Sequence, residues 1–588
     1  RPGVIDFAAS ARADTLADAV RAQVPVRRGG SEVVAAEYGS LTGAGLDVPV
    51  KLPAKALPGS GRVSVTLAPT LVGGLRGAFA VMSEDPLHSW EVRLSRSVLA
   101  SDYLRLKPML GDAMQWPQAA KLIKANLVLA DKYQAANGGM GFWGTDPRGV
   151  SSWLSVYTAL AFDWLREAGH EVPAKVDADV RAYLRRMLTR KHAPVLRAGT
   201  LAALALSPRD KTDRRAVAAM LPSLPKLRLF GQALLLQAAV AIHDRSSADA
   251  IVRSLFKHAE ESAGGVSFNE HQGGIYVDLL ATPLRSNCAI LDALSRYHTA
   301  WGNENLVGST PQKLARWVGS RRRNQGGWPN SQENVFCTSA IVHYADAYER
   351  PVQGLEGRVS WPGRKLQSAR FDSRRAPAVR LDGPAPEQGK GFAVQLAHSG
   401  KGRLYYDLSV HYVMPPFALP AADAGLTITR HYAVRRGKHW QPLGEHGVLH
   451  RGDLVRVELV VDTPTERHHV VVDDPLPGTF EAVDPHLATS APGLPASQDE
   501  VGIIHYQGGG WPSLSFIEGG FYHRETAFDA VRFFADTLPA GRYHLSYTAQ
   551  VLAAGTFLSP APTVKEIYQP DVFGRGLPVT IKVTMPDD

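Results

Sequence analysis

The sequence has few groups that could build a disulfide framework or a metal centre. Only two of its 588 residues are cysteines, Cys288 and Cys337. Their spacing fits no zinc motif, and two cysteines cannot make the framework of a small disulfide-rich domain. Two buried free thiols are the simpler interpretation, whereas an oxidising compartment would allow one disulfide between neighbouring helices.

Long apolar runs and a leader segment are also missing. No apolar run approaches the roughly 18 residues of a membrane-spanning helix, and no signal peptide or lipid-attachment motif follows Arg1. The chain starts without methionine, directly in strand-like sequence. We therefore expect a fragment or a mature product, with targeting information upstream.

Charge of one sign is not concentrated in any part of the chain. The net charge of +9 is spread along the sequence, and the densest basic run is Arg321-Arg322-Arg323. Three residues are too few to predict nucleic-acid binding, and a solvated helix end is favoured over an anion-binding patch. With 45% apolar and 21% charged residues, the composition is that of a globular protein of several domains.

Motifs of common catalytic and cofactor sites are missing as well. The sequence contains no phosphate-binding loop, dinucleotide-binding fingerprint or paired-histidine metal helix. His343 and the pair His468-His469 lack metal-ligand spacing and are interpreted as surface or core residues. Asp278 and Asp292 are candidate carboxylates of an enzyme, but nothing in the sequence brings them together. We predict no cofactor and no metal.

Secondary-structure patterns divide the chain into four parts. Residues 1–70 have strand character, since Val63 to Leu67 alternates between apolar and polar side chains. Residues 71–350 are helical, and Trp153, Tyr157 and Trp164 fall on one helix face. Strand patterns return in residues 351–425 and again in residues 426–588.

Three similar turns punctuate the helical part. Asn137–Trp143, Gly264–Phe268 and Gln325–Trp328 each combine a Gly-Gly pair with a following aromatic residue. The glycines permit a tight reversal, and the aromatic residue is expected to fill the gap between adjacent helices. The first spacing is close to twice the second, which indicates a repeat. Repeated helical hairpins of this kind predict an α/α toroid, as in terpene cyclases and thioester domains.

The first helices of this part carry a family resemblance. Ser89-Trp90-Glu91-Val92, with Ser95-Arg96 downstream, resembles the thioester segment of bacterial alpha-2-macroglobulins, which reads Cys-x-Glu-Gln before a Ser-Arg pair. The alignment places Ser89 at the cysteine, Glu91 at the glutamate and Val92 at the glutamine. Serine is a far weaker nucleophile than a thiolate, and valine has no acyl group. The resemblance therefore implies a family member without a thioester.

We expect structural roles for the residues of this segment. Ser89 is interpreted as a structural turn serine, because no nucleophile elbow surrounds it. Trp90 is expected to be a packed aromatic residue rather than a ligand platform. Glu91 could hold the turn by accepting backbone N–H groups.

The last part of the chain strengthens the resemblance. Val470–Glu481 and Gly541–Pro560 are similar to the family's last macroglobulin domain. Tyr568, in Glu566–Pro570, resembles the tyrosine that covers the thioester in bacterial members. It would either dock at Ser89 and Trp90 as a contact between domains or be an ordinary strand-end tyrosine.

The resemblance implies a fold in four segments. Residues 1–70 and 351–425 would form one CUB-type β-sandwich, into which the α/α toroid of residues 71–350 is inserted. Residues 426–588 would form a macroglobulin-type β-sandwich. The chain would match only the C-terminal portion of a family member.

The resemblance also implies a function. We expect a non-enzymatic periplasmic envelope protein, with an inner-membrane anchor in an upstream region as a further option, that traps proteases without covalent attachment. Its partners would be target proteases or other envelope proteins. Two alternatives stay open, namely an envelope scaffold that binds partners without inhibiting them and an α/α-toroid enzyme.

Overall fold

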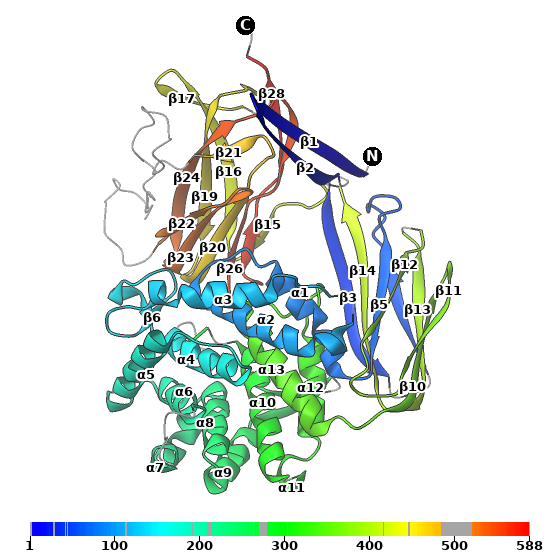
Figure 1. Cartoon of the computed structure of the whole chain (residues 1–588), viewed down its shortest axis with the longest axis vertical. Helices are drawn as coiled ribbons and strands as arrows, with labels where there is room; N and C mark the ends of the chain where they lie inside the picture. Colours follow the sequence, from blue (N-terminus) through cyan, green and yellow to red (C-terminus); the bar gives the residue numbers. More distant parts are fainter. Residues whose placement is uncertain are drawn as a thin grey trace.

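A ring of helices and two β-sandwiches make up the chain (Figure 1). One sandwich lies beside the helical ring, and the other lies across one end of it. A computed structural model describes residues 3–586, apart from 27–29, 42, 44, 112–113, 191, 208–213, 263, 270–278, 281, 303, 388, 416, 445–446 and 484–519.

The first two strands form a hairpin of their own. β1 (Gly3–Ala13) pairs with β2 (Leu16–Val26) in an antiparallel sheet of two strands. The sequence assigned residues 1–70 to a single β-domain, whereas the structure places these two strands in a separate sheet. Their described side chains are exposed on both faces of the hairpin, and the large apolar ones are Val4, Ile5, Phe7, Leu16, Val20 and Val24.

The sandwich beside the helices is assembled from two distant segments, and we call it the split sandwich. Its sheets have the strand orders β11-β10-β13-β4 and β12-β5-β14-β3. The central strand β5 pairs on both sides with strands from beyond the helices, so that Val65 lies opposite Leu381 and Leu408. The helices are therefore inserted into one sandwich, which confirms the predicted fold class. The strands are β3 (Ser31–Leu41), β4 (Gly45–Lys51), β5 (Arg62–Ala68), β10 (Gln353–Trp361), β11 (Arg364–Phe371), β12 (Val379–Pro384), β13 (Gly391–Lys401) and β14 (Leu404–Met414).

The inserted helices form a double ring. Six inner helices each contact the next and close on themselves, in the order α2, α4, α6, α8, α10 and α13. Most helices between them in sequence lie outside, so inner helices such as α8 are buried almost all round. The inner helices are α2 (Trp90–Leu110), α4 (Ser152–Glu167), α6 (Pro194–Ala205), α8 (Leu229–Ala241), α10 (Pro283–Trp301) and α13 (Ser331–Tyr348). The others are α1 (Arg76–Ser83), α3 (Ala119–Val128), α5 (Ala174–Thr189), α7 (Arg214–Ala218), α9 (Arg245–Phe256), α11 (Glu304–Val307) and α12 (Thr310–Ser320).

The chain leaves and rejoins the split sandwich at neighbouring points. The helical insertion begins after β5, and the backbone N–H of Leu71 donates to Glu349 Oε1 at 2.9 Å, shortly before β10. Its two ends are thus joined by a hydrogen bond. None of the helices in the described ranges is long and apolar enough to cross a membrane.

The glycine pairs make tight turns, as predicted. Gly138, Gly265 and Gly326 have φ angles of 83°, 138° and 89°, which side chains rarely allow. Trp328 fills the gap between α12 and α13 and donates from Nε1 to the carbonyl of Val318 at 3.1 Å. In the first turn, Phe142 and Trp143 pack against the helical core and also contact His469 and His523 of the C-terminal sandwich.

The two cysteines form a disulfide bond between α10 and α13. Cys288 and Cys337 have Cα atoms 4.8 Å apart, and both are fully buried. The interpretation as free thiols is therefore wrong, and the alternative of one disulfide across neighbouring helices is confirmed.

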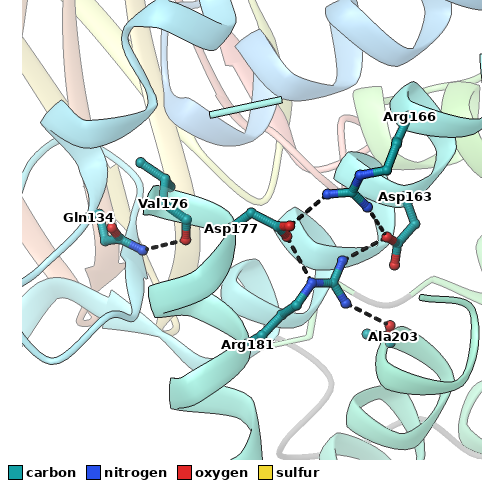
Figure 2. A network of polar contacts seen from close by, with 7 residues as sticks. All are labelled: Gln134, Asp163, Arg166, Val176, Asp177, Arg181 and Ala203. Atoms are coloured by element: carbon teal, nitrogen blue, oxygen red, sulfur yellow. Dashed lines mark hydrogen bonds and ion pairs between the residues drawn. The ribbon is translucent and has the colours of Figure 1, made fainter. Parts of the chain in front are cut away.

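A buried network of ion pairs ties α5 to the inner ring (Figure 2). Arg181 of α5 donates to Asp177 at 2.9 Å and to Asp163 of α4 at 2.6 Å. Arg166 donates to the same two carboxylates, at 2.5 Å to Asp163 and 2.6 Å to Asp177. Arg181 also reaches the carbonyl of Ala203 near the end of α6. Each carboxylate is thus shared by two guanidinium groups, which compensates the cost of burying the charges.

The C-terminal sandwich has a six-stranded and a five-stranded sheet, with the orders β15-β27-β26-β20-β23-β22 and β17-β16-β19-β24-β21. A small sheet, β18-β28-β25, completes it. The alternating strand β19 buries Val455, Val457, Leu459 and Val461 between the large sheets. The strands are β15 (Ala422–Ala424), β16 (Thr427–Arg436), β17 (His439–Pro442), β18 (Val448–His450), β19 (Leu454–Thr463), β20 (Arg467–Pro475), β21 (Phe480–Ala482), β22 (His523–Thr526), β23 (Ala530–Leu538), β24 (Gly541–Val551), β25 (Gly555–Ser559), β26 (Thr563–Glu566), β27 (Phe573–Arg575) and β28 (Val579–Thr584).

Candidate functional site at the mouth of the helical ring

The first turns of the inner helices meet at one end of the ring, which we call the mouth. Arg285, in the first turn of α10, shows this convergence. Its guanidinium lies over the rings of Trp153 in α4 and Phe230 in α8, and it donates to Gln332 in α13 at 3.0 Å. Helix N-termini carry partial positive charge, so the mouth favours negative groups. The C-terminal sandwich lies across this end of the ring (Figure 1).

Ser89 and Trp90 have structural roles at the start of α2. Ser89 caps the helix, since its hydroxyl accepts the backbone N–H of Val92 at 3.3 Å. Trp90 is fully buried, stacks on Tyr133 with ring centres 5.4 Å apart, and donates from Nε1 to Thr158 at 3.0 Å. The geometry agrees with a turn serine and a packed aromatic residue.

Glu91 is the centre of the mouth. Its side chain is fully buried, and each carboxylate oxygen accepts two hydrogen bonds. Ser95 and Gln332 donate to Oε1, both at 2.7 Å. Ser331 donates to Oε2 at 2.7 Å and Tyr568 at 2.8 Å. The sequence suggested backbone donors for Glu91, whereas these four donors are all side chains.

Tyr568 brings the C-terminal sandwich onto the mouth. It follows β26 and is 7% exposed, with its hydroxyl on Glu91 and its ring 5.2 Å from the ring of His469. The side-chain amide of Asn330 donates to its carbonyl at 3.0 Å. Burial, and then the charge of Glu91, raise the pKa of Tyr568 well above its ordinary value, so the hydroxyl keeps its proton. The structure thus brings Tyr568 to the segment that contains Ser89 and Glu91.

A second buried acid lies one residue beyond Gln332. Glu333 accepts a hydrogen bond from Thr282 at 2.6 Å, and burial raises its pKa to about 7. Burial also lowers the pKa of Arg285 to about 9. Arg285 donates to the carbonyl of Leu279 at 2.6 Å as well as to Gln332. The mouth therefore contains a guanidinium and two carboxyl groups with little access to water.

Side chains around the mouth hold the helical ring and the C-terminal sandwich together. Trp143 stacks on His523 with ring centres 4.3 Å apart. His88 pairs with Glu525 at 3.5 Å. Burial opposes the charge of Glu525, but hydrogen bonds from His523 and His88 outweigh it and lower its pKa to about 2. Val92 belongs to an apolar cluster shared by the ring and the sandwich, with Leu87, Val471 and Phe534.

The other candidates from the sequence lie away from the mouth or have different roles. Arg322 is not at a solvated helix end, because it pairs with Asp407 of the split sandwich at 3.0 Å and lies over Tyr38. Arg323 pairs with Asp571 of the C-terminal sandwich at 2.7 Å. The helical ring therefore meets the split sandwich and the C-terminal sandwich at this basic run. A run of three basic residues could not reveal these contacts.

Of the candidate carboxylates and histidines, Asp292 and His343 lie together in a polar network. Asp292 pairs with Arg296 at 3.0 Å and with His343, and it also accepts from Gln237. No group of three or more histidine, cysteine, aspartate or glutamate side chains among the described residues could hold a metal ion. Asp278 lies outside the described residues. His469 contacts Phe142 and Tyr568 at the covered mouth.

Sequence reasoning missed Ser331 and Gln332 as partners of Glu91. Their signal is weak, since they belong to the run Asn330-Ser331-Gln332-Glu333-Asn334 before an apolar helix. Asn330 caps this helix by accepting the N–H of Glu333 at 2.9 Å. An unusually polar first turn was therefore the only indication of a buried polar site.

Comparison with known proteins agrees with this arrangement. A model of the bacterial alpha-2-macroglobulin MG10 domain matches residues 425–571. The chain is a relative of the bacterial alpha-2-macroglobulins. An alpha-2-macroglobulin homologue from Nostoc sp. is 29% identical over 262 residues, which cover 43% of this chain and 13% of the relative. The chain thus matches a small part of the length of this curated relative.

Solved alpha-2-macroglobulin structures have the same fold as the whole chain. The Escherichia coli protein from domain MG7 to its C-terminus superposes with a TM-score of 0.72 and 16% identity, covering 100% of this chain and 88% of that one. Salmonella alpha-2-macroglobulin reacted with methylamine gives 0.73 and 17%, covering 100% and 36%. The inserted helical ring and the two sandwiches therefore correspond to the C-terminal part of bacterial alpha-2-macroglobulins.

Proposed function

We propose that this chain is part of a bacterial alpha-2-macroglobulin that traps proteases without a thioester. The proposal rests on the hydrogen bonds at the mouth, which already engage the side chains of the segment that aligns with the thioester. Ser89 uses its hydroxyl to cap α2, and Glu91 is fully hydrogen-bonded within the site. A thioester requires a thiol beside a glutamine-derived acyl group, and these positions have a hydroxyl and the hydrocarbon side chain of Val92.

The proposal assigns Ser89, Trp90, Glu91 and Val92 to the degenerate thioester position, and Tyr568 to the covering tyrosine. The contact of Tyr568 with Glu91 supports this assignment, because it lies where a covering residue would act. In this chain the contact would only join the C-terminal sandwich to the helical ring. The division at residues 70, 350 and 425, including a CUB-type domain, is part of the same proposal.

Capture would then depend on shape and surface area. Stable non-covalent complexes bury roughly 1,200–2,000 Å² in total, so the trap must enclose or grip its target over a wide surface. We propose target proteases as partners and the periplasm as the location, with an anchor in the inner membrane through another part of the protein. We propose no enzymatic activity, because the candidate carboxylate Asp292 is engaged by Arg296 and His343.

The decisive experiment uses the full-length natural protein and a panel of proteases. Residual activity is measured on a large and a small substrate, and the mixtures are run on denaturing gels. We expect loss of activity on the large substrate, continued cleavage of the small one, and no denaturant-resistant conjugate. No effect on any protease would refute the trap and favour an envelope scaffold that binds other partners.

Treatment with methylamine provides a second test, since Salmonella alpha-2-macroglobulin has been reacted with it. Mass spectrometry of this chain after methylamine treatment should show no added mass. The matched variant combines Ser89→Cys with Val92→Gln and restores both thioester side chains. An adduct on the unaltered chain would contradict the loss of the thioester.

A further inference from the structure

A cavity of about 390 Å³ lies between the helical ring and the split sandwich. It adjoins the C-terminal end of α13, at the opposite end of that helix from the mouth. Its lining comes from α12, from the end of α13 and from the turn between β13 and β14. The side chains that matter below are Gln312, Tyr344, Glu349, Arg350, Arg403 and Tyr405.

Two guanidinium groups of this cavity have no carboxylate partner in the described part of the chain. Arg350 is exposed directly after α13, and Arg403 is half-buried in the turn between β13 and β14. The nearby Arg374 is engaged differently, because it donates to the carbonyls of Ala345 and Glu349. It thereby satisfies the end of α13 and leaves the other two arginines available. Planar guanidinium groups bind the oxygens of carboxylates and phosphates in pairs.

Two neutral tyrosines line the cavity. Burial raises the pKa of Tyr344 to about 12. Burial, and then the charge of Glu349, raise the pKa of Tyr405 well above its ordinary value. Both hydroxyl groups therefore keep their protons at neutral pH. The hydroxyl of Tyr344 can donate to an anion, whereas that of Tyr405 is hydrogen-bonded to Glu349.

The acidic and amide groups of the lining narrow the choice of ligand. Glu349 accepts the N–H of Leu71 and is hydrogen-bonded to Thr70 and Tyr405, so its carboxylate is already engaged within the protein; burial raises its pKa. The side-chain oxygen of Gln312 is buried and has no hydrogen-bond partner among the described residues. Buried acceptors are normally satisfied, so a fitting ligand carries a hydrogen-bond donor as well as anionic oxygens.

We infer that this cavity binds a small hydroxylated oxyanion, a sugar phosphate or a sugar carboxylate, with Arg350 and Arg403 on the anionic group and Gln312 accepting from a ligand hydroxyl. Its volume falls within the range of roughly 300–1,000 Å³ that is usual for small-molecule sites. Because the lining belongs to both bodies, the bound anion joins the helical ring to the split sandwich. This site is independent of the mouth and of protease capture.

Calorimetric titration of the 588-residue chain tests the inference. The probes are glucose 6-phosphate, glucuronate and glucose, at an ionic strength kept constant with sodium chloride. We expect at least one anionic sugar to bind and glucose not to bind. Arg403→Gln and Arg350→Gln should each weaken binding by about 10- to 100-fold, the usual effect of losing a charge-assisted hydrogen bond.

A matched control and a further variant show whether the loss of binding is specific to the arginines of the cavity. Arg370→Gln removes an exposed arginine of the same sandwich, which pairs with Asp372, and should leave the affinity unchanged. Tyr344→Phe removes a donor without changing charge and should weaken binding less than the arginine variants. Binding of glucose 6-phosphate alone identifies a phosphate ester, and binding of glucuronate alone identifies a carboxylate. No binding of either anionic sugar, or an affinity of the two arginine variants equal to that of the unaltered chain, overturns the inference.

Discussion

Removing the hydroxyl of Tyr568 should loosen the C-terminal sandwich from the mouth. Tyr568→Phe keeps the ring and its contact with His469, but it removes one of the two donors to Glu91 Oε2. The carboxylate is fully buried, so water does not replace the lost donor in the closed state. A hydrogen bond to a charged group contributes about 1.5–3 kcal/mol. We expect the free energy of separating the C-terminal sandwich from the helical ring to fall by about 2 kcal/mol. The equilibrium constant for this separation would then rise roughly 30-fold.

Hydrogen exchange of the backbone amides in residues 89–95 measures this opening. These amides begin α2 beneath Tyr568, and their exchange should accelerate by the same factor if it requires separation of the bodies. Tyr543→Phe is the matched control, because Tyr543 donates to the carbonyl of Pro539 within the sandwich. A double-mutant cycle with Glu91→Gln then isolates the pair. A change below about 0.5 kcal/mol for Tyr568→Phe, within the usual range of neutral surface substitutions, would refute the reasoning.

Three further predictions concern the stability of the helical ring. Replacing Cys288 and Cys337 with alanine should cost about 4 kcal/mol for a loop of this length, seen in thermal unfolding as a clear loss relative to the oxidised chain. Glu333 has a folded-state pKa of about 7, above its ordinary 4.5. Its protonated form is therefore favoured by folding, and the unfolding free energy should fall by about 3 kcal/mol as pH rises from 4.5 to 7. Glu333→Gln should remove this fall when denaturant titrations are compared across that range. Arg181→Met leaves buried Asp163 with less compensation and should cost about 3–5 kcal/mol, whereas a cost below 1 kcal/mol would mean that the network contributes little.

Local patterns explain which parts of the fold could be predicted. The alternation around Val65 and the apolar face through Trp153 and Tyr157 report directly on strand and helix. Glycine pairs mark turns because few other residues adopt the required φ angles. The family resemblance then supplied the insertion of the helices into the split sandwich.

The missed features depend on contacts between distant residues. Ser331 and Gln332 meet Glu91 across about 240 positions of sequence, and no local pattern connects them. The disulfide could not be assigned, since it depends on α10 and α13 being neighbours in the ring. The buried state of Arg322 likewise follows from Asp407 and Tyr38, which belong to another body.

The hydrogen bond from Leu71 to Glu349 has a consequence for how this architecture could evolve and be engineered. Because the inserted ring starts and ends at one point, the host sandwich needs only a short gap between β5 and β10 to accommodate about 280 residues. An insertion with adjacent ends can be exchanged as a cassette without altering the pairing of its host. A load applied to the ring therefore reaches the sandwich through two neighbouring chain ends and through the ion pair of Arg322 with Asp407, without pulling directly on the ends of the paired strands.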